Sequence, residues 1–408
     1  MKYSNINLLT RIYNISKIYT WNSSNNSLDV FTNKEILIKD GLINQISNSI
    51  SSDIGKNIDA KQSIVTPGFI DSHTHPVFKG DRANEYIKRL EGQTYDEIKN
   101  NGGGIISSIS KTRESNFDEL YKNTYSNIKP FIEYGTTTIE AKSGYGLNLN
   151  DEIKSLEVIK KINSILDIDI IPTFLGAHDI PPEYKDNKEE YIQLICNVMI
   201  PKVAEEKLAV FCDVFCEPGY FNLDETELII NKAKEFNLIP RLHVDEFVDS
   251  SGAELAVKLD AYSADHLMSV SNSGIEALSN SKTIATILPG TTFFLNSNKY
   301  ANGRKMIDKG CNVSIASDFN PGTCTIRSMP NIMHLAMQKC GLNLEEAFLG
   351  ATYNAAKSLG KEDTIGLIKK DYNADLVFWN LNNLSDIPYW FDSCYSKIEF
   401  VIKKGKLI

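Results

Sequence analysis

The stretch SIVTPGFIDSHTH, residues 63–75, gives the clearest indication of the fold. Its apolar run has the length and composition of a strand buried in a parallel sheet. It ends in His73-Thr74-His75, and because side chains two residues apart on a strand point the same way, both imidazoles face one site. Such a pair suits a metal ion, although two packed or surface histidines fit the pattern equally well.

Seven further short strand-like runs follow, separated by amphipathic stretches such as EIKSLEVIKKINSIL and EEYIQLICNVMIPKVAEE. This repeated alternation of a strand with a helix predicts an α/β fold, a (β/α)8 TIM barrel. The chemistry of such a barrel lies just beyond the C-terminal ends of its strands. The seven runs are TTTIEA (136–141), DIIPTFLGA (169–177), AVFCDVFC (209–216), IPRLHVDEF (239–247), AYSADHL (261–267), TIATILPG (283–290) and NVSIASDF (312–319).

Both ends of the chain look like β-hairpins instead. EILIKDGLINQI, at 35–46, alternates apolar and polar residues around Asp40-Gly41, which is a hairpin signal. Near the other end, ADLVFWNL (374–381) and KIEFVIKKGKLI (397–408) are strand-like runs, the second with a turn at Lys404-Gly405. We therefore expect a smaller β-rich part at the termini beside one large barrel.

The amino-acid composition argues against several classes of function. The 408 residues are 42% hydrophobic and 23% charged, which is typical of a soluble globular protein with a sizeable core. The formal net charge of -9 comes without a cluster of Lys and Arg interleaved with aromatics, which argues against nucleic acid as a partner. No run approaches the roughly 18 apolar residues of a membrane span, and the first residues lack a secretory signal. Because seven scattered cysteines suit reduced thiols, we expect a cytoplasmic protein without a membrane partner.

The positions of the histidines indicate a metal site. Of six histidines, only His334 lies on a helical stretch, and neutral imidazoles that converge at the mouth of a barrel are typical ligands of Zn or Fe. The five at or near the ends of predicted strands are His73, His75, His178, His243 and His266.

Asp318 closes the eighth run, in SIASDFNPG, where a carboxylate oxygen suits a metal site that keeps open positions for water. A turn-forming aspartate before Asn-Pro-Gly is the alternative. Because the eighth strand of a closed barrel lies beside the first, Asp318 is expected next to the histidines of the first run, which favours the metal site.

Glu246 and Arg82 are candidates for proton transfer and for anion binding. Glu246 follows His243 by three residues and suits a general acid and base beside a metal, with a solvated rim carboxylate as the alternative. Arg82 is one of only seven arginines, and its planar guanidinium suits a carboxylate, whereas a surface salt bridge is the commoner fate. Tyr95 and Tyr145 offer hydroxyl donors, or pack half-buried.

Several of these segments resemble known families. TPGFIDSHTHP, RLHVDEF, SADHL and SIASDFNPG are similar to the amidohydrolase superfamily. GDRANEY, the GGGI ending at Ile105, EAKSGYGLN, FLGAHDIPPEY and ILPGTTFFL resemble the imidazolonepropionase family within it. The resemblance covers nearly the whole chain, and it implies a composite β-sandwich at 1–66 plus 366–408 around a metal-dependent barrel at 67–365.

The resemblance also implies roles for individual residues. It implies that one Zn or Fe ion per chain is held by His73, His75, His243 and Asp318. It places His266 next to these ligands, without a bond to the metal. It implies that the small-molecule substrate is contacted by Arg82, Tyr95, Tyr145, His178, Glu246, Asn320, Gly322 and Thr323. It further implies a homodimer. Lys142 raises a question, because some amidohydrolases bridge two metals with a carbamylated lysine, but the flanking Ser-Gly-Tyr-Gly matches the mononuclear family.

The reaction that the resemblance implies is hydrolysis of the ring amide of 4-imidazolone-5-propanoate to N-formimidoyl-L-glutamate, a step of histidine degradation. We expect Glu246 with His266 to manage the proton of the attacking water, and His178 to bind the substrate and stabilise the developing oxyanion. Arg82 and the turn from Asn320 to Thr323 are expected to hold the carboxylate.

Two other hypotheses stay open at this stage. One is a nucleobase or aminohydrolase-type deaminase on the same scaffold, which would release ammonia. Arg82 and the Ser-Gly-Tyr-Gly segment favour a carboxylate-bearing ring over a neutral base. The other is a metal-free scaffold that assembles partners, against which the complete set of proposed ligands argues.

Overall fold

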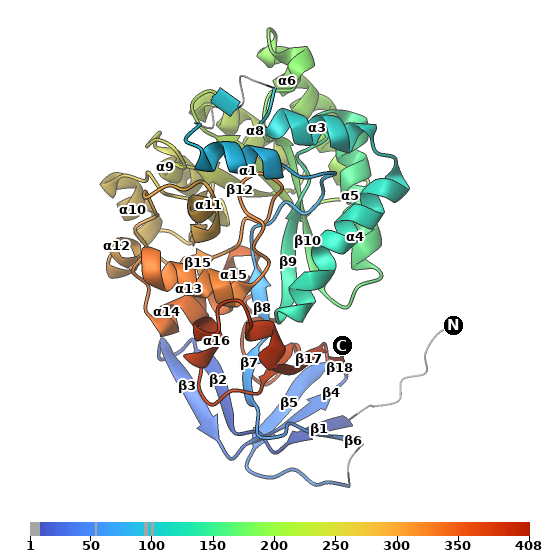
Figure 1. The fold of residues 1–408 in the computed structure, drawn as a ribbon, viewed down its shortest axis with the longest axis vertical. Helices are drawn as coiled ribbons and strands as arrows, with labels where there is room; N and C mark the ends of the chain where they lie inside the picture. Colours follow the sequence, from blue (N-terminus) through green and yellow to red (C-terminus); the bar gives the residue numbers. More distant parts are fainter. Residues whose placement is uncertain (1–8, 54, 94–96, 99–101) are drawn as a thin grey trace.

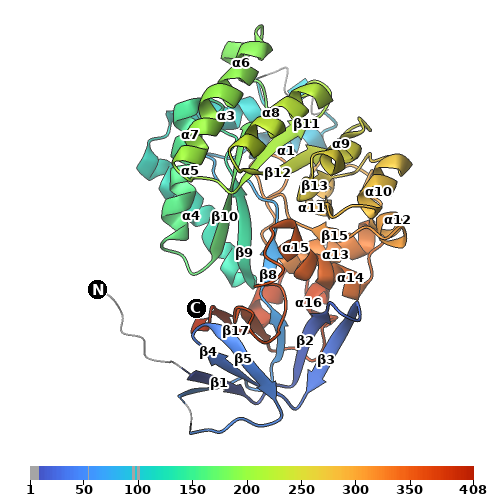
Figure 2. The ribbon, with the colours of Figure 1, turned by 180° about the vertical axis from the view of Figure 1, so that it is seen from behind.

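The computed structural model describes residues 9–53, 55–93, 97–98 and 102–408. Within this part, eight parallel strands form one sheet in chain order, which confirms the predicted barrel. Helices surround the sheet (Figures 1 and 2). The strands are β8 (Phe69–Asp71), β9 (Thr136–Lys142), β10 (Asp169–Ala177), β11 (Phe211–Cys216), β12 (Ile239–Val244), β13 (Ser263–His266), β14 (Ile284–Ile287) and β15 (Val313–Ile315).

The first predicted run forms two strands, not one. It splits at Gly68, where β7 (Ile64–Pro67) ends in the terminal sheets and β8 begins in the barrel. Gly68 donates its N–H to Asp375, while the next residue, Phe69, donates to Gly135 before β9. A Cβ on Gly68 would lie only 2.2 Å from the side chain of Thr137, so the switch between sheets needs glycine here.

The barrel closes between its first and eighth strands through the residues that follow them. His75 donates its N–H to the carbonyl of Phe319 at 2.8 Å, and Asp318 donates to the carbonyl of His73 at 3.0 Å. The histidines of the first run and Asp318 therefore lie side by side, as the sequence predicted.

Local sequence signals explain where several helices begin. The helices α4 (Phe117–Glu133), α8 (Leu223–Glu235) and α14 (Leu344–Gly350) each start at an asparagine whose side chain accepts the N–H of a glutamate three residues on. The glutamate side chain accepts the asparagine N–H in return. The helices that cover the barrel are α1 (Ala83–Leu90), α3 (Ile105–Glu114), α4 (Phe117–Glu133), α5 (Leu149–Asn163), α6 (Lys188–Leu194), α7 (Ile200–Glu205), α8 (Leu223–Glu235), α9 (Gly252–Lys258), α10 (Asn272–Ser279), α11 (Pro289–Phe294), α12 (Gly303–Asp308), α13 (Met329–Lys339), α14 (Leu344–Gly350) and α15 (Tyr353–Ser358).

Of the two amphipathic stretches quoted from the sequence, one forms a single helix and the other is interrupted. EIKSLEVIKKINSIL lies mostly in α5, whose Leu156, Ile159 and Ile162 are buried in the main apolar core. EEYIQLICNVMIPKVAEE is divided into α6 and α7 by a π-helical turn, Ile195–Met199. Pro201 explains the division, because it has no N–H to give to the preceding turn.

Two further sheets lie below the barrel; one contains only strands from the N-terminal part of the chain, and the other combines strands from both ends (Figures 1 and 2). Both predicted hairpins form, with Asp40-Gly41 and Lys404-Gly405 at positive φ in their turns. The proposed domain limits at 66/67 and 365/366 stay a prediction. One sheet contains β5 (Leu42–Ser47), β4 (Glu35–Lys39), β1 (Leu9–Tyr13) and β6 (Lys56–Asp59), and the other contains β18 (Lys406–Leu407), β17 (Ile398–Lys403), β16 (Leu376–Trp379), β7, β2 (Lys17–Asn22) and β3 (Ser27–Thr32).

The two terminal sheets share an apolar core of their own. It includes Ile12 and Ile38 from one sheet and Ile18, Leu376 and Phe378 from the other, all almost fully buried. A short helix, α16 (Asp386–Tyr389), packs against α13 of the barrel. Among the residues described, no helix has the length and apolar character needed to cross a bilayer.

Candidate metal centre and active site

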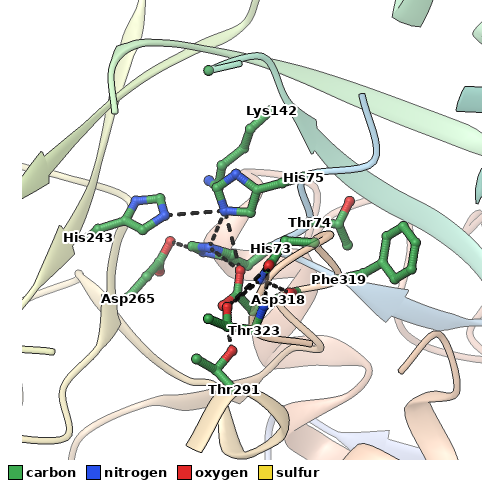
Figure 3. A network of polar contacts seen from close by, with 12 residues as sticks. His73, Thr74, His75, Lys142, His243, Asp265, Thr291, Asp318, Phe319 and Thr323 are labelled. Carbon is green, nitrogen blue, oxygen red and sulfur yellow. Dashed lines mark hydrogen bonds and ion pairs between the residues drawn. The ribbon is translucent and has the colours of Figure 1, made fainter. Parts of the chain in front are cut away.

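The four predicted ligands meet at the C-terminal mouth of the barrel (Figure 3). His73 and His75 follow β8, His243 lies near the end of β12, and Asp318 follows β15. Nε2 of His75 lies 3.2 Å from Nε2 of His73 and 3.4 Å from Nε2 of His243. Oδ1 of Asp318 lies 3.3 Å from Nε2 of His75 and 3.5 Å from Nε2 of His73.

These separations fit one small metal ion. Ligand atoms about 2.0–2.1 Å from a zinc ion, at the corners of a tetrahedron, lie about 3.3–3.4 Å from one another. The three imidazoles and the carboxylate are all nearly fully buried, and no cation among the described residues accounts for the convergence of their lone pairs. His266 forms a second possible group with His73 and His243, so it borders the same centre.

Buried carboxylates orient two of the ligand histidines from behind. Oδ2 of Asp265 accepts a hydrogen bond from Nδ1 of His73 at 2.8 Å, and Oδ2 of Asp213 lies 3.0 Å from Nδ1 of His243. The hydrogen bond to Asp265 places the proton of His73 on Nδ1 and leaves its Nε2 lone pair for the metal. The charge of Asp213 lies on the Nδ1 side of His243. Thr291 donates its hydroxyl to the second oxygen of Asp318. These partners were not predicted from the sequence.

Lys142, at the end of β9, forms ion pairs with two buried carboxylates. Its ammonium lies 2.7 Å from Oε1 of Glu140 and 2.7 Å from Oδ2 of Asp213, with all three side chains buried. Although burial would lower it, Asp213 and then Glu140 hold the pKa of Lys142 above its usual value. A lysine that stays protonated is a poor nucleophile for carbon dioxide, which argues against a carbamylated bridge between two metals.

Glu246 reaches the cleft beside His266. Its Oε2 lies 3.7 Å from Nδ1 of His266, and both side chains are buried. Burial, together with the charges of Asp318 and Glu217, holds the pKa of the Glu246 carboxyl well above its usual range. A carboxyl with a raised pKa beside a metal centre is suited to exchange protons near neutral pH.

The centre opens into a cleft with about 570 Å³ of empty space, part of it open to solvent. The polar residues of its lining include most of the predicted substrate contacts. The apolar residues of the lining were not predicted as a group from the sequence. The polar lining consists of His75, Arg82, Tyr145, His178, His243, Glu246, His266, Asp318, Asn320 and Thr323, and the apolar lining consists of Ile105, Phe215, Tyr220, Phe247 and Leu295.

Arg82 is buried at the edge of this cleft rather than lying in a surface salt bridge. Its Nε and one terminal nitrogen lie 2.8 and 2.7 Å from Oε2 of Glu85. The same Glu85 oxygen accepts the N–H of Gly104 at the start of α3. A Cβ on Gly322 would lie 2.1 Å from the other terminal nitrogen of Arg82, so glycine at 322 makes room for the guanidinium.

Asn320 shapes the turn that faces Arg82. Its side-chain oxygen accepts the N–H groups of Gly322 and Thr323 at 2.8 and 2.7 Å, and its amide nitrogen donates to the Thr323 hydroxyl and the Asp318 carbonyl. The Asn320 side chain is thus occupied within its own turn. Tyr95 lies outside the described residues.

Tyr145 and His178 stand on the adjoining wall of the cleft. Glu152 accepts the N–H groups of Gly144, Gly146 and Leu147, and so holds the loop that carries Tyr145. Nδ1 of His178 lies 2.8 Å from the carbonyl of Gly144, which can only accept.

The protonation of His178 follows from this contact. Burial, with His75 and His243 nearby, holds the pKa of His178 well below its usual value. The neutral ring therefore carries its proton on Nδ1 and offers a lone pair at Nε2.

Comparison with known proteins places this site in a family. The chain matches the amidohydrolase family over residues 64–408. An imidazolonepropionase of Clostridium tetani is 43% identical over 391 residues, which are 94% of this chain and 92% of that protein. An imidazolonepropionase of Kosmotoga olearia is 44% identical over 381 residues, 93% of this chain and 92% of that protein.

Solved structures share the fold at lower identity. A guanine deaminase from C. acetobutylicum with bound guanine has a TM-score of 0.75 and 17% identity, covering 98% of this chain and 100% of its own. An adenosine deaminase from Xanthomonas campestris with bound zinc has a TM-score of 0.73 and 14% identity, covering 98% of this chain and 92% of its own. At these identities the likeness concerns the fold alone.

Proposed function

The chain belongs to the amidohydrolase family and, within it, to the imidazolonepropionases, and from this premise we propose that it hydrolyses the ring amide of 4-imidazolone-5-propanoate to N-formimidoyl-L-glutamate. The observation that carries the proposal is that a converging metal-ligand set and a buried arginine line one cleft. The substrate has an amide to hydrolyse and a carboxylate to anchor. The reaction belongs to histidine degradation.

We assign one Zn or Fe ion per chain to Nε2 of His73, His75 and His243 and to Oδ1 of Asp318. A metal ion bound there supplies Lewis acidity to a carbonyl oxygen and makes water a nucleophile at neutral pH. The support for a single ion is the ion-paired Lys142, because a bridged pair of metals would need that lysine in another chemical form.

Glu246 is the proposed proton carrier. Its carboxylate accepts the proton of the attacking water as oxygen adds to the ring carbonyl, and returns the proton to the ring nitrogen as the carbon–nitrogen bond breaks. His266 lies 3.7 Å from the carboxylate and is proposed to hold it in place during both transfers.

Arg82 is proposed to bind the propionate. Its guanidinium keeps one edge against Glu85 and faces the cleft between α1 and the Asn320 turn. The backbone of that turn, at Gly322 and Thr323, forms the opposite side of the anion site, while Asn320 fixes its shape.

His178 is proposed to accept a hydrogen bond from a ring N–H of the substrate. A second role, stabilising the oxyanion, was also expected of His178 from the sequence, and that role requires a donor. Because Nδ1 already donates to Gly144, the neutral ring has only an acceptor at Nε2, and the tautomer argues against that second role. Tyr145, beside it, keeps its proposed role as a hydroxyl donor to the substrate.

A deaminase would bind a different kind of substrate in the cleft. It would release ammonia from a neutral base, which has no carboxylate for Arg82 to bind. The imidazolonepropionase relatives at 43–44% identity favour the cyclic amide, whereas the deaminase structures share only the fold.

The test combines metal analysis with turnover. We expect about one Zn or Fe per chain, and loss of the ultraviolet absorbance of imidazolonepropionate without ammonia release. Asp318→Ala removes a proposed ligand and should abolish turnover. Arg82→Ala should raise KM about 10- to 100-fold, the range of one charge-assisted hydrogen bond.

Matched controls use residues of the same kind outside the cleft. His334→Asn and Arg304→Ala should keep metal content and KM, because His334 lies on α13 and Arg304 forms exposed ion pairs with Asp308 and Glu346. Metal with ammonia release from a nucleobase, or no metal and no turnover, would contradict the proposal. A homodimer and a cytoplasmic location remain part of the proposal, to be tested by sedimentation and by cell fractionation.

A further inference from the structure

The proposed proton carrier lies on a segment without helix or strand. Glu246 is the second residue after β12, and α9 begins only at Gly252. Its neighbour Phe247 is 42% exposed. A carboxylate that must carry protons between two atoms needs a fixed backbone, so the contacts of this segment decide how Glu246 is placed.

Glu217 holds the N–H side of the segment. It directly follows β11, the strand next to β12, and only 1% of it is exposed. Its Oε1 accepts the backbone N–H of Glu246 in a short hydrogen bond and the N–H of Phe247 at 3.2 Å. One buried oxygen thus binds two successive amides.

Ser269 holds the carbonyl side. It lies after β13, the strand on the other side of β12. Its hydroxyl donates to the carbonyl of Glu246 at 3.1 Å, its N–H donates to the carbonyl of Asp245 at 2.7 Å, and Lys299 donates to its hydroxyl at 2.6 Å. The peptide groups of Glu246 are therefore fixed from both neighbouring strand ends.

Burying a carboxylate at position 217 costs free energy. No cation among the described residues forms a hydrogen bond or ion pair with it, although a buried carboxylate is costly without one. Burial raises the pKa of Glu217 to about 7, against the opposing effect of the two amides. A buried acid with a raised pKa and no cationic partner is a candidate for a functional role.

We propose that Glu217 is a positioning residue that fixes the backbone of Glu246, so that the Glu246 carboxylate stands at the distance from the metal centre that proton transfer requires. The inference rests on the proposed function of Glu246. Glu217 is not among the residues that line the cleft, and it acts through the backbone of Glu246 and the adjoining Phe247. Its effect therefore falls on kcat, while metal content and KM stay close to those of the unaltered protein.

The experiment compares two substitutions of Glu217 in the metal-loaded full chain. Glu217→Met keeps length and volume but has no acceptor for the two amides, and should lower kcat about 10- to 100-fold, since a displacement of about 1 Å costs that much. Glu217→Gln keeps an oxygen that can accept both N–H groups, and should restore kcat to within about fivefold of the unaltered enzyme. KM should change less than about threefold in both.

A double-mutant cycle tests whether Glu217 acts through Glu246. In a Glu246→Gln background, adding Glu217→Met should change the residual kcat less than about twofold. Asp375→Asn is the matched control, because Asp375 is a buried carboxylate that accepts the N–H of Lys404 in the terminal sheets, far from the cleft. It should leave kcat and KM unchanged.

The outcomes separate this inference from the proposed function. An unaltered enzyme without turnover overturns the proposed function. An active enzyme whose kcat is unaffected by Glu217→Met, or is lowered equally in both backgrounds, overturns the positioning role alone. If Glu217→Met does not fold, Glu217→Asp, which withdraws the oxygen by one methylene group, replaces it in the cycle with the same two criteria.

Discussion

Asp265→Asn should weaken metal binding without unfolding the protein. Asp265 accepts the hydrogen bond from Nδ1 of His73 at 2.8 Å, with both side chains fully buried. Although burial alone would raise it, Arg241 and His73 hold the pKa of Asp265 below its usual range, so the group is a carboxylate. Asparagine keeps the shape but removes the charge that fixes the tautomer of His73.

The expected size of the effect follows from one hydrogen bond. A bond to a charged group contributes about 1.5–3 kcal/mol. Since about 1.4 kcal/mol corresponds to a tenfold change in a binding constant, zinc should bind about 10- to 100-fold more weakly. Arg241 still donates to the carbonyls of Ser358 and Ser72, at 2.7 and 2.8 Å, so the fold should survive.

The assay is competition for zinc between the metal-free protein and a chromogenic chelator at one pH. Asp375→Asn removes a buried carboxylate in the terminal sheets and should leave the zinc affinity unchanged. A zinc affinity of Asp265→Asn within twofold of the unaltered protein would refute the view that this carboxylate orients His73.

Two further predictions concern the cleft and the barrel interior. Gly322→Ala should raise KM about 10- to 100-fold with a smaller change in kcat, because the new Cβ would lie 2.1 Å from a terminal nitrogen of Arg82. An unchanged KM in steady-state kinetics would contradict this prediction. Lys142→Met leaves Glu140 and Asp213 without their shared cation and should lower the free energy of unfolding by about 3–5 kcal/mol. A loss below about 1 kcal/mol, measured by urea unfolding, would show that the ion pairs are not needed for stability.

The sequence predicted the proposed ligands because strand periodicity controls where they point. His73 and His75 are two apart, and Asp318 ends the eighth run, so closure of the barrel is enough to bring them together. The division at Gly68 was not predicted, since the apolar pattern continues across it. Only the partner strands, which lie far away in sequence, distinguish β7 from β8.

The partners behind the ligands were missed for a different reason. Asp213, Arg241 and Asp265 each lie within a predicted barrel strand, where a charged side chain is rarely buried unless it is paired. That was a usable signal, although it names no partner, because pairing across the barrel depends on the register between strands. Arg82 was undecided for the same reason: Glu85 and Gly322 lie near it only after folding.

One buried network links the proposed ligands around the barrel. Glu140 accepts the N–H of Thr74, which stands between the first two histidines, and pairs with Lys142. Lys142 pairs with Asp213, which holds His243. Because successive side chains of a strand point to opposite faces, a one-residue slip in β9, β11 or β12 would turn a member of this network out of the interior. The geometry of the centre thus depends on the register of strands that contribute no ligand, so substitutions in β9 and β11 should alter metal affinity.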